Sequence, residues 1–195
     1  RLACVPSGPY RLDKNGRPTL TDSAMLDDAI DAAGRTRFEL ERALTTAAMG
    51  APLRGRPLRV VSGNFVYARP AGIRDGKDLR FTGEVRRIDI DAIDAAMSAD
   101  SVVVVSPLGL APSGEMFNLD AADVAQRLAI DLKATKLIAL APGLRPRQGE
   151  PTREFTLRSA RQHLAECGND HDLHAEWLDR IATACAQGVK RGHLV

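Results

Sequence analysis

The chain has 195 residues, a formal net charge of +2 and 44% hydrophobic residues, so it is long enough to bury a substantial core in one domain or two small ones. The nearly balanced charge argues against a nucleic-acid partner, and the apolar runs are far shorter than the ~20 residues of a membrane span. The amino end carries no signal-peptide pattern and the three cysteines are scattered, so we expect a cytoplasmic protein with no disulfide framework and no membrane partner.

The amino-terminal part is expected to be a loop followed by one long helix. Residues 1–20 show no periodicity and contain several prolines and glycines. Thr21 or Asp22 can cap a helix whose apolar residues recur with a period near 3.6 and which ends at Gly50. Gly34 and Arg37 interrupt the apolar stripe, which argues against an unbroken helix across them.

The pattern then changes to one typical of strands. The segments Leu58–Ser62, Phe65–Arg69 and Phe81–Ile88 alternate hydrophobic with charged residues, which predicts a half-exposed antiparallel ribbon. Asp75–Gly76 marks a turn within it. Asp89 can cap a short helix that runs to Met97.

The stretch Asp100–Gly143 predicts a strand, a crossover helix and a second strand. Ser101–Val105 contains four consecutive valines and suits a strand buried on both faces, and Lys136–Leu140 is a second apolar run. An apolar stripe between them predicts a helix starting near Asp120. Such a unit favours a right-handed crossover with parallel strands, and ligands bind at the carboxyl ends of such strands. We therefore expect a site in the loop Ser106–Asn118.

The carboxyl-terminal part predicts a loop, a helix and a strand. Leu144–Glu154 is charged and turn-rich, which is typical of a mobile loop. A helix is predicted over Leu173–Gln187, with Gly188 as its left-handed cap, followed by a strand over Val189–Val195. Because the chain begins at Arg1 without methionine and stops on a predicted strand, we expect the natural protein to continue.

A zinc site is conceivable at Cys167, His171 and His174, because cysteine and histidine are zinc ligands and histidines three residues apart can share a helix face. The spacing of a full zinc signature is absent. We therefore favour solvated histidines, and we predict no metal.

No nucleophile elbow, phosphate-binding loop or dinucleotide fingerprint is present in the sequence. Ser113–Gly114 lies in the central loop and is interpreted as a turn. The basic pairs Arg86–Arg87 and Lys190–Arg191 are interpreted as solvated, or as contacts to carboxylates of a small ligand or a neighbouring subunit.

Several motifs in order resemble the amino-acid-kinase-like domain of bacterial N-acetylglutamate synthase. They are the segments Val60–Gly76, Thr82–Asp89, Val104–Leu119 and Gly188–Leu194, and the resemblance runs with gaps over Thr19–Val195. It implies an α/β fold, a three-layer αβα sandwich of the amino-acid-kinase (carbamate-kinase-like) type. The central sheet would be mainly parallel, with an antiparallel ribbon, and incomplete at both ends. It also implies one domain over residues 1–195, without the first strands and without the acetyltransferase domain that follows in the family.

In that family the synthase transfers acetyl from acetyl-coenzyme A to L-glutamate, the first step of L-arginine biosynthesis. The resemblance implies that both substrates bind to the acetyltransferase domain, and that this segment is not catalytic and holds no cofactor. The kinase-like domain would assemble a homo-oligomer and bind L-arginine as feedback inhibitor.

The rival interpretation is an N-acetylglutamate kinase, which shares the fold. Kinases of this family have a motif similar to Asn-x-Asn-Ala-Asp at the start of the crossover helix, where this chain has Asn118–Asp123. In an alignment without gaps, the aspartate that organises phosphoryl transfer falls on Ala122. The lysine of the kinase motif Gly-Gly-Met-x-x-Lys falls at about Trp177. The Thr-Asp that follows the second strand in kinases is replaced by Ala141–Pro142. Losing three parts of one phosphate site disfavours kinase activity.

The resemblance implies two sets of site residues. A vestigial substrate cleft would include Ser106, Gly109 and Asn118. The arginine that kinases place before Val-Thr-Asp is replaced by Thr19, with Arg17 two residues earlier, which argues against a glutamate-type site here. The L-arginine effector site maps onto the end of the last helix, at Gln187, Gly188 and Val189.

Carbonyls freed at a helix carboxyl end suit a guanidinium or ammonium donor. The plain alternative is that Gly188 only caps the helix. A catalytically silent oligomerisation module is the remaining alternative function.

Overall fold

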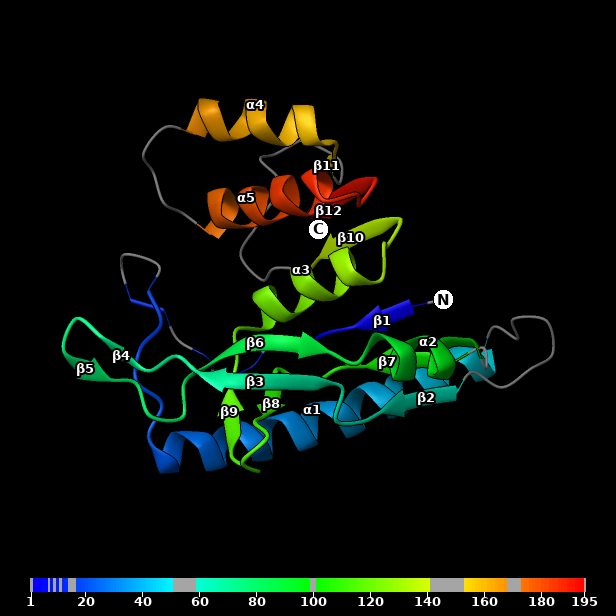
Figure 1. The fold of residues 1–195 in the computed structure, drawn as a ribbon. Coiled ribbons are helices and arrows are strands. Elements are labelled where there is room, and N and C mark those ends of the chain that lie inside the picture. Colours follow the sequence, from blue (N-terminus) through cyan, green and yellow to red (C-terminus); the bar gives the residue numbers. More distant parts are fainter. Residues whose placement is uncertain are drawn as a thin grey trace. The chain divides into compact units, whose positions relative to one another are not determined.

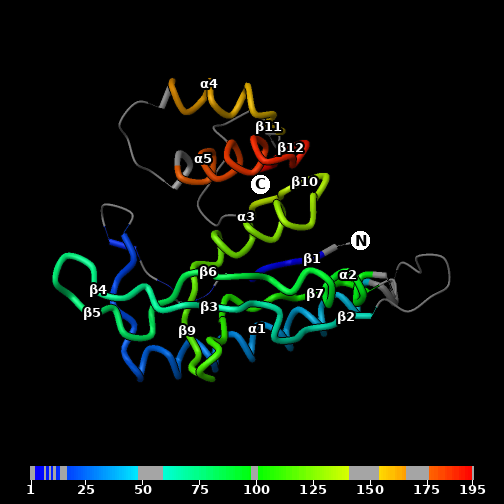
Figure 2. The backbone as a smooth tube through the Cα atoms, viewed as in Figure 1, coloured from blue at the N-terminus to red at the C-terminus, as the bar shows by residue number. Residues whose placement is uncertain are grey.

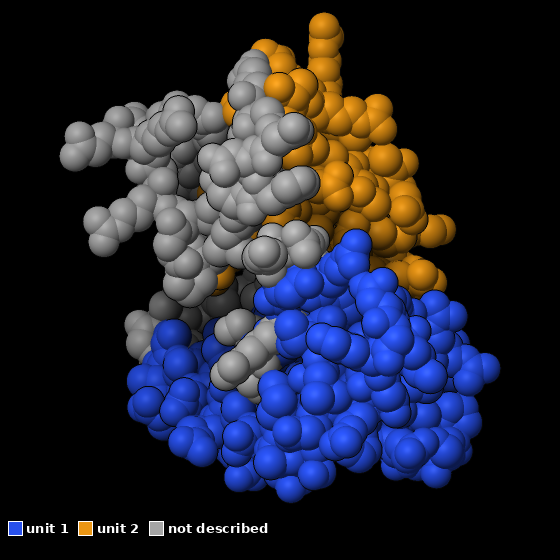
Figure 3. Space-filling view, turned by 90° about the vertical axis from the view of Figure 1, so that its left-hand side faces the viewer, with its two compact units in different colours: residues 1–124 blue, residues 125–195 orange. Residues whose placement is uncertain are grey.

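The structure is a computed structural model, and it describes residues 2–6, 8, 10, 12–13, 17–50, 59–98, 101–140, 153–167 and 173–194 (Figure 1). The chain divides into two compact units, unit 1 over residues 1–124 and unit 2 over residues 125–195 (Figure 3). The predicted α/β class is confirmed, whereas the assignment of residues 1–195 to one domain stays a prediction. Among the helices in the described ranges, none is long and apolar enough to cross a membrane.

Unit 1 contains nine strands and two complete helices in its described residues. In chain order they are β1 (Leu2–Cys4), α1 (Ser23–Gly50), β2 (Arg59–Ser62), β3 (Val66–Pro70), β4 (Ile73–Arg74), β5 (Lys77–Asp78), β6 (Gly83–Ile88), α2 (Ile90–Ser98), β7 (Ser101–Val104), β8 (Leu108–Leu110) and β9 (Met116–Asn118). Helix α3 (Ala121–Asp131) starts in unit 1 and continues into unit 2. Unit 2 further contains β10 (Lys136–Ala139), β11 (Arg153–Phe155), α4 (Leu157–Cys167), α5 (Leu173–Ala186) and β12 (Arg191–Leu194).

A parallel sheet of order β1-β7-β2 is built around the four valines. Val102–Val105 are at most 5% exposed, which confirms the prediction of a strand buried on both faces. The prediction of a loop over residues 1–20 was wrong for Leu2–Cys4, which pairs with Val102–Val104. Three residues are too few to show a period, and the partner strand determines their conformation.

The second sheet has the order β6-β3-β8-β9 and corrects two predictions. β3 and β6 pair antiparallel as expected, but Arg59–Ser62 pairs in parallel with β7 in the other sheet. The segment Ser106–Asn118, which was predicted to be a loop, contains the hairpin β8–β9. Its strands have three residues each, and its prolines and glycines obscured them at the sequence level.

Helix α1 runs unbroken over Ser23–Gly50 and packs on β2, β8 and β9 (Figure 1). Asp22 is its cap, because Asp22 Oδ1 accepts a hydrogen bond from the backbone N–H of Met25 at 2.9 Å. The interruption of the apolar stripe at Gly34 and Arg37 does not break the helix. A glycine in a long helix lowers its stability without ending it.

In unit 2 the sheet has the order β10-β12-β11. β10 pairs in parallel with β12, so in the described residues it is not a sheet neighbour of β7 as the crossover prediction required. Arg153 and Glu154, which were predicted to lie in a loop, belong to β11, and this strand pairs antiparallel with β12. The core comprises Leu137, Phe155, Leu178, Ile181 and Leu194 among others.

Candidate functional site

A small cavity lies where the strands β2 and β7 end, next to the hairpin β8–β9. Its volume is about 120 Å³, and we call it the carboxyl-end hollow. Polar lining comes from Arg37, Ser62, Asn64 and Ser106. Apolar lining comes from Val66, Leu108, Leu110 and Met116. A parallel sheet places ligands at this edge.

Two residues of the predicted cleft, Ser106 and Gly109, line this hollow. Ser106 lies between β7 and β8, and Gly109 is the middle residue of β8. A methyl group at Gly109 would lie 2.6 Å from Ala68 Cβ and 2.9 Å from Leu119 Cδ1. Gly109 is therefore required by strand packing, and its role in binding stays a prediction.

The third residue, Asn118, does not line the hollow. It lies in a buried polar cluster with Thr21 and Thr82, in which each residue is at most 3% exposed. Thr82 Oγ1 donates to the carbonyl of Thr19 at 2.8 Å and lies 2.9 Å from Thr21 Oγ1. Asn118 Nδ2 donates to Thr21 Oγ1 over a long 3.5 Å. The sequence comparison with kinases singled out Thr19 and Asn118 separately. In the structure Thr82 and Thr21 connect the two residues through hydrogen bonds.

The buried cluster leaves one acceptor unsatisfied. Asn118 Oδ1 has no hydrogen-bond partner within the described ranges. Such a group is costly when buried, so it marks either a position for a water or a donor supplied by a ligand.

The first turn of α3 carries acidic residues but not at the kinase position. Asp120 caps the helix, because its Oδ1 accepts from the backbone N–H of Ala122 at 2.9 Å. Its carboxylate therefore stabilises the helix start. Burial raises the pKa of nearby Tyr10 above its usual value, and Asp120 and Asp123 raise it further.

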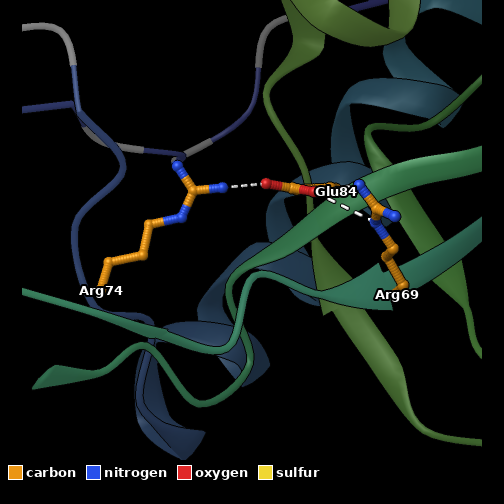
Figure 4. A network of polar contacts seen from close by, with 3 residues as sticks. All are labelled: Arg69, Arg74 and Glu84. Carbon is orange, nitrogen blue, oxygen red and sulfur yellow. Dashed lines mark hydrogen bonds and ion pairs between the residues drawn. The ribbon is translucent and has the colours of Figure 1, made fainter. Parts of the chain in front are cut away.

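Sequence reasoning missed a charged network on unit 1, in which two arginines share one carboxylate (Figure 4). Arg69 donates through Nε at 3.1 Å and Nη2 at 2.8 Å to Glu84 Oε2, while Arg74 pairs with Oε1. Because Arg69 and Glu84 face each other in the β3–β6 register, the strand pairing was the signal that could have predicted this pair.

The network ties down the hairpin β4–β5, which extends beyond the ends of β3 and β6 (Figure 2). A second ion pair, from Arg17 to Asp75 at 2.6 Å, meets the hairpin at its turn. Asp75 and Gly76 have φ values of 50° and 75°, which suit a type I′ turn and confirm the predicted turn. The hairpin is thus held by exposed charges in addition to its backbone bonds.

The predicted effector residues Gln187, Gly188 and Val189 lie in unit 2, at the end of α5. Val189 N–H donates to the Ala184 carbonyl at 3.1 Å and Gly188 N–H to the Cys185 carbonyl at 3.3 Å. With Gly188 at φ 109°, these bonds form a Schellman cap, as the sequence predicted. Whether these residues bind arginine stays a prediction.

The candidate zinc ligands Cys167, His171 and His174 lie outside the residues or side chains that the structure describes. In the described part of the chain no group of three or more histidine, cysteine and acidic residues could hold a metal ion. Of the basic pairs, Arg87 stacks its guanidinium 4.2 Å from the centroid of the Tyr67 ring.

Comparison with known proteins places these features in a family. The sequence profile described as "Amino acid kinase family" matches residues 9–141, which is more than half of the chain. The chain belongs to the amino acid kinase family. This agrees with the αβα fold type implied by the sequence motifs, and the parallel and antiparallel pairing observed here fits it.

Curated relatives of this amino acid kinase family chain are named amino-acid acetyltransferase. The protein from Azotobacter vinelandii is 46% identical over 178 residues, which cover 90% of this chain and 41% of the relative. The protein from Pseudomonas putida is 44% identical over the same shares. The chain thus spans about two fifths of the length of the curated relatives it matches.

Solved structures of the same fold include N-acetylglutamate synthase from Neisseria gonorrhoeae, complexed with coenzyme A and L-arginine. Its TM-score is 0.79 at 28% identity, and the match covers 95% of this chain and 43% of that protein. A carbamate kinase from Giardia has a TM-score of 0.62 at 10% identity, with 88% of this chain and 67% of that protein covered. This second likeness supports the fold alone.

Proposed function

We propose that this chain is the regulatory and oligomer-forming part of an N-acetylglutamate synthase. The whole enzyme would transfer acetyl from acetyl-coenzyme A to L-glutamate in L-arginine biosynthesis, through an acetyltransferase domain separate from this segment. The observation that carries the proposal is the 46% identity, over 90% of this chain, to a protein named amino-acid acetyltransferase.

L-Arginine is the proposed effector, and residues Gln187–Val189 are its proposed contact. The Schellman bonds use the carbonyls of Ala184 and Cys185. The next two carbonyls, of Ala186 and Gln187, accept no backbone bond within the ranges that the structure describes. Carbonyls at the negative end of a helix suit the guanidinium and ammonium donors of arginine. The complex of the Neisseria synthase with L-arginine supports the choice of effector.

Phosphoryl transfer is disfavoured by the residue at the position of the kinase aspartate. Ala122 has no carboxylate, and Asp120 is engaged in capping α3. A kinase needs a carboxylate free to organise its metal ions. We therefore expect no ATP hydrolysis that depends on N-acetylglutamate.

Calorimetric titration of the 195-residue chain with L-arginine tests the effector proposal. We expect saturable heat with L-arginine and none with L-citrulline, which has the same shape without the cationic guanidinium. Gly188→Ala strains a residue at φ 109° and is expected to weaken binding. Gly114→Ala is the matched control, because Gly114 has φ 89° and lies in the β8–β9 turn of unit 1. No heat at millimolar arginine would contradict the proposal.

The alternative of a silent oligomerisation module is separated by the mass in solution. Light scattering with and without L-arginine is expected to show an oligomer whose size or shape responds to arginine, because an effector acts by preferring one arrangement of subunits. An oligomer indifferent to arginine, with no binding heat, would favour the module.

A further inference from the structure

The carboxyl-end hollow contains a cation that the proposed function does not use. Arg37 extends from the middle of α1, and its Nε is buried without a hydrogen-bond acceptor among the described residues. The nearest carboxylate oxygen is Glu41 Oε1, at 3.6 Å, which is beyond hydrogen-bond reach. The charge of Arg37 is therefore balanced while its N–H is unsatisfied.

Glu41 Oε1 is shared between this ion pair and a second partner. Its Oε1 accepts a hydrogen bond from Ser62 Oγ at 3.3 Å. The Arg37 guanidinium also lies 4.7 Å from the centroid of the Phe38 ring. Arg37 therefore keeps an unsatisfied N–H while it lines the hollow, and a planar guanidinium offers paired donors to a carboxylate.

The rest of the lining is divided by chemistry. Asn64 and Ser106 offer an amide and a hydroxyl on the polar part, while Leu108, Leu110 and Met116 give an apolar part. A ligand that matches both parts has one anionic end and a hydrocarbon tail.

The volume limits the ligand to a few heavy atoms. About 120 Å³ is slightly less than an apolar protein cavity of about 150 Å³ that binds benzene. Nucleotides and sugar phosphates need pockets of at least about 300 Å³. The hollow thus suits a ligand of about the size of a four-carbon acid.

We propose that the carboxyl-end hollow binds a short-chain monocarboxylic acid, with the carboxylate on Arg37 and the alkyl tail against Leu108, Leu110 and Met116. Asn64 and Ser106 are the further donors to the carboxylate. The site is in unit 1 and does not require the arginine contact at α5. A chain that fails to bind L-arginine can still bind the acid, so the two tests fail independently.

The test uses the methionine methyl groups of the full chain as probes. Of the four methionines, Met116 lines the hollow and Met97 is buried in α2. On titration of ¹³C-methyl-methionine protein with butyrate, we expect a saturable shift of the Met116 signal and none at Met97. Sodium chloride at equal ionic strength controls for salt, and butan-1-ol has the same tail without the carboxylate.

Arg37→Gln is expected to weaken butyrate binding about tenfold or more, because it removes a charge-assisted hydrogen bond. Arg35→Gln is the matched control, since Arg35 is exposed on the same helix and does not line the hollow. Equal shifts with butan-1-ol, unchanged affinity in Arg37→Gln, or no saturable shift at Met116 would each overturn the proposal. The comparison of butyrate with butan-1-ol needs no variant, so it decides even if Arg37→Gln is unstable.

Discussion

Gly192 is packed too closely against a neighbouring side chain in unit 2 to accept a larger residue. It is a central residue of β12 and pairs with Leu137 on one side and Phe155 on the other. A methyl group there would lie 2.3 Å from Ile181 Cγ2 and 2.9 Å from Ile181 Cγ1. Carbon atoms pack best at about 3.5–4.0 Å, so Gly192→Ala must displace α5 or the sheet.

The magnitude follows from the overlap of more than an ångström with a side chain that is fully buried. Overpacking of a well-packed core costs about 1–3 kcal/mol. Because the three nearest atoms all belong to the buried Ile181, we expect Gly192→Ala to cost about 3 kcal/mol. Ile181→Ala alone leaves a cavity and is expected to cost about 2–5 kcal/mol. In the double variant the new methyl group enters that cavity, so the sum of the single effects should exceed the double effect by about 1–3 kcal/mol.

Urea unfolding followed by tryptophan fluorescence measures the stability of unit 2. Trp177 is the single tryptophan of the chain and packs against the unit 2 core, so its signal reports on that core. The free energies of unfolding come from the midpoints and slopes. Additive single effects, or a loss below about 1 kcal/mol for Gly192→Ala, would refute the packing argument.

Three further predictions concern unit 1. Gly34→Ala is expected to stabilise the chain by about 0.5–1 kcal/mol, because a methyl group there meets nothing within 4 Å, and a higher midpoint in thermal circular dichroism checks it. Tyr10 has a pKa raised by burial and by Asp120, so the folded chain keeps its phenol proton when the unfolded chain loses it; stability should fall as pH rises above about 10, and Tyr10→Phe should flatten that fall in unfolding measured against pH. Glu84→Gln should lower stability by less than about 1 kcal/mol, because its ion pairs with Arg69 and Arg74 are exposed. It should nevertheless speed amide hydrogen exchange in β4–β5, and high salt should reduce this effect. Unchanged exchange would contradict a role of these ion pairs in holding the hairpin.

Local signals in the sequence predicted the elements whose stabilising groups are neighbours in the chain. The cap of α1 uses Asp22 and Met25, and the cap of α5 uses residues within Ala184–Val189. The run of four valines predicts a buried strand from composition alone, and these residues are buried in the structure. Such features need no knowledge of the rest of the fold.

The elements that the sequence did not predict depend on distant partners. Leu2–Cys4 is a strand because Val102–Val104 lies beside it, and the three-residue strands of the hairpin β8–β9 have no period to detect. The buried cluster joins Thr21 to Thr82 and Asn118 across 61 and 97 residues. No short window of sequence contains both members of such a pair. The sequence could therefore indicate individual residues of the candidate cleft, but not which of them lie together.

The same distinction bears on what this chain retains of a kinase site. The motif itself shows that Ala122 has no carboxylate at the position of the kinase aspartate. The cap made by Asp120 stabilises the first turn of α3 without that carboxylate. The hollow beside β7 is formed instead by packing, since Gly109 must be small for β8 to approach Ala68 and Leu119. Loss of the charged groups therefore does not collapse the cavity. A space thus remains at the carboxyl ends of β2 and β7, and the carboxylate binding proposed for it depends on Arg37 of α1, which lines it.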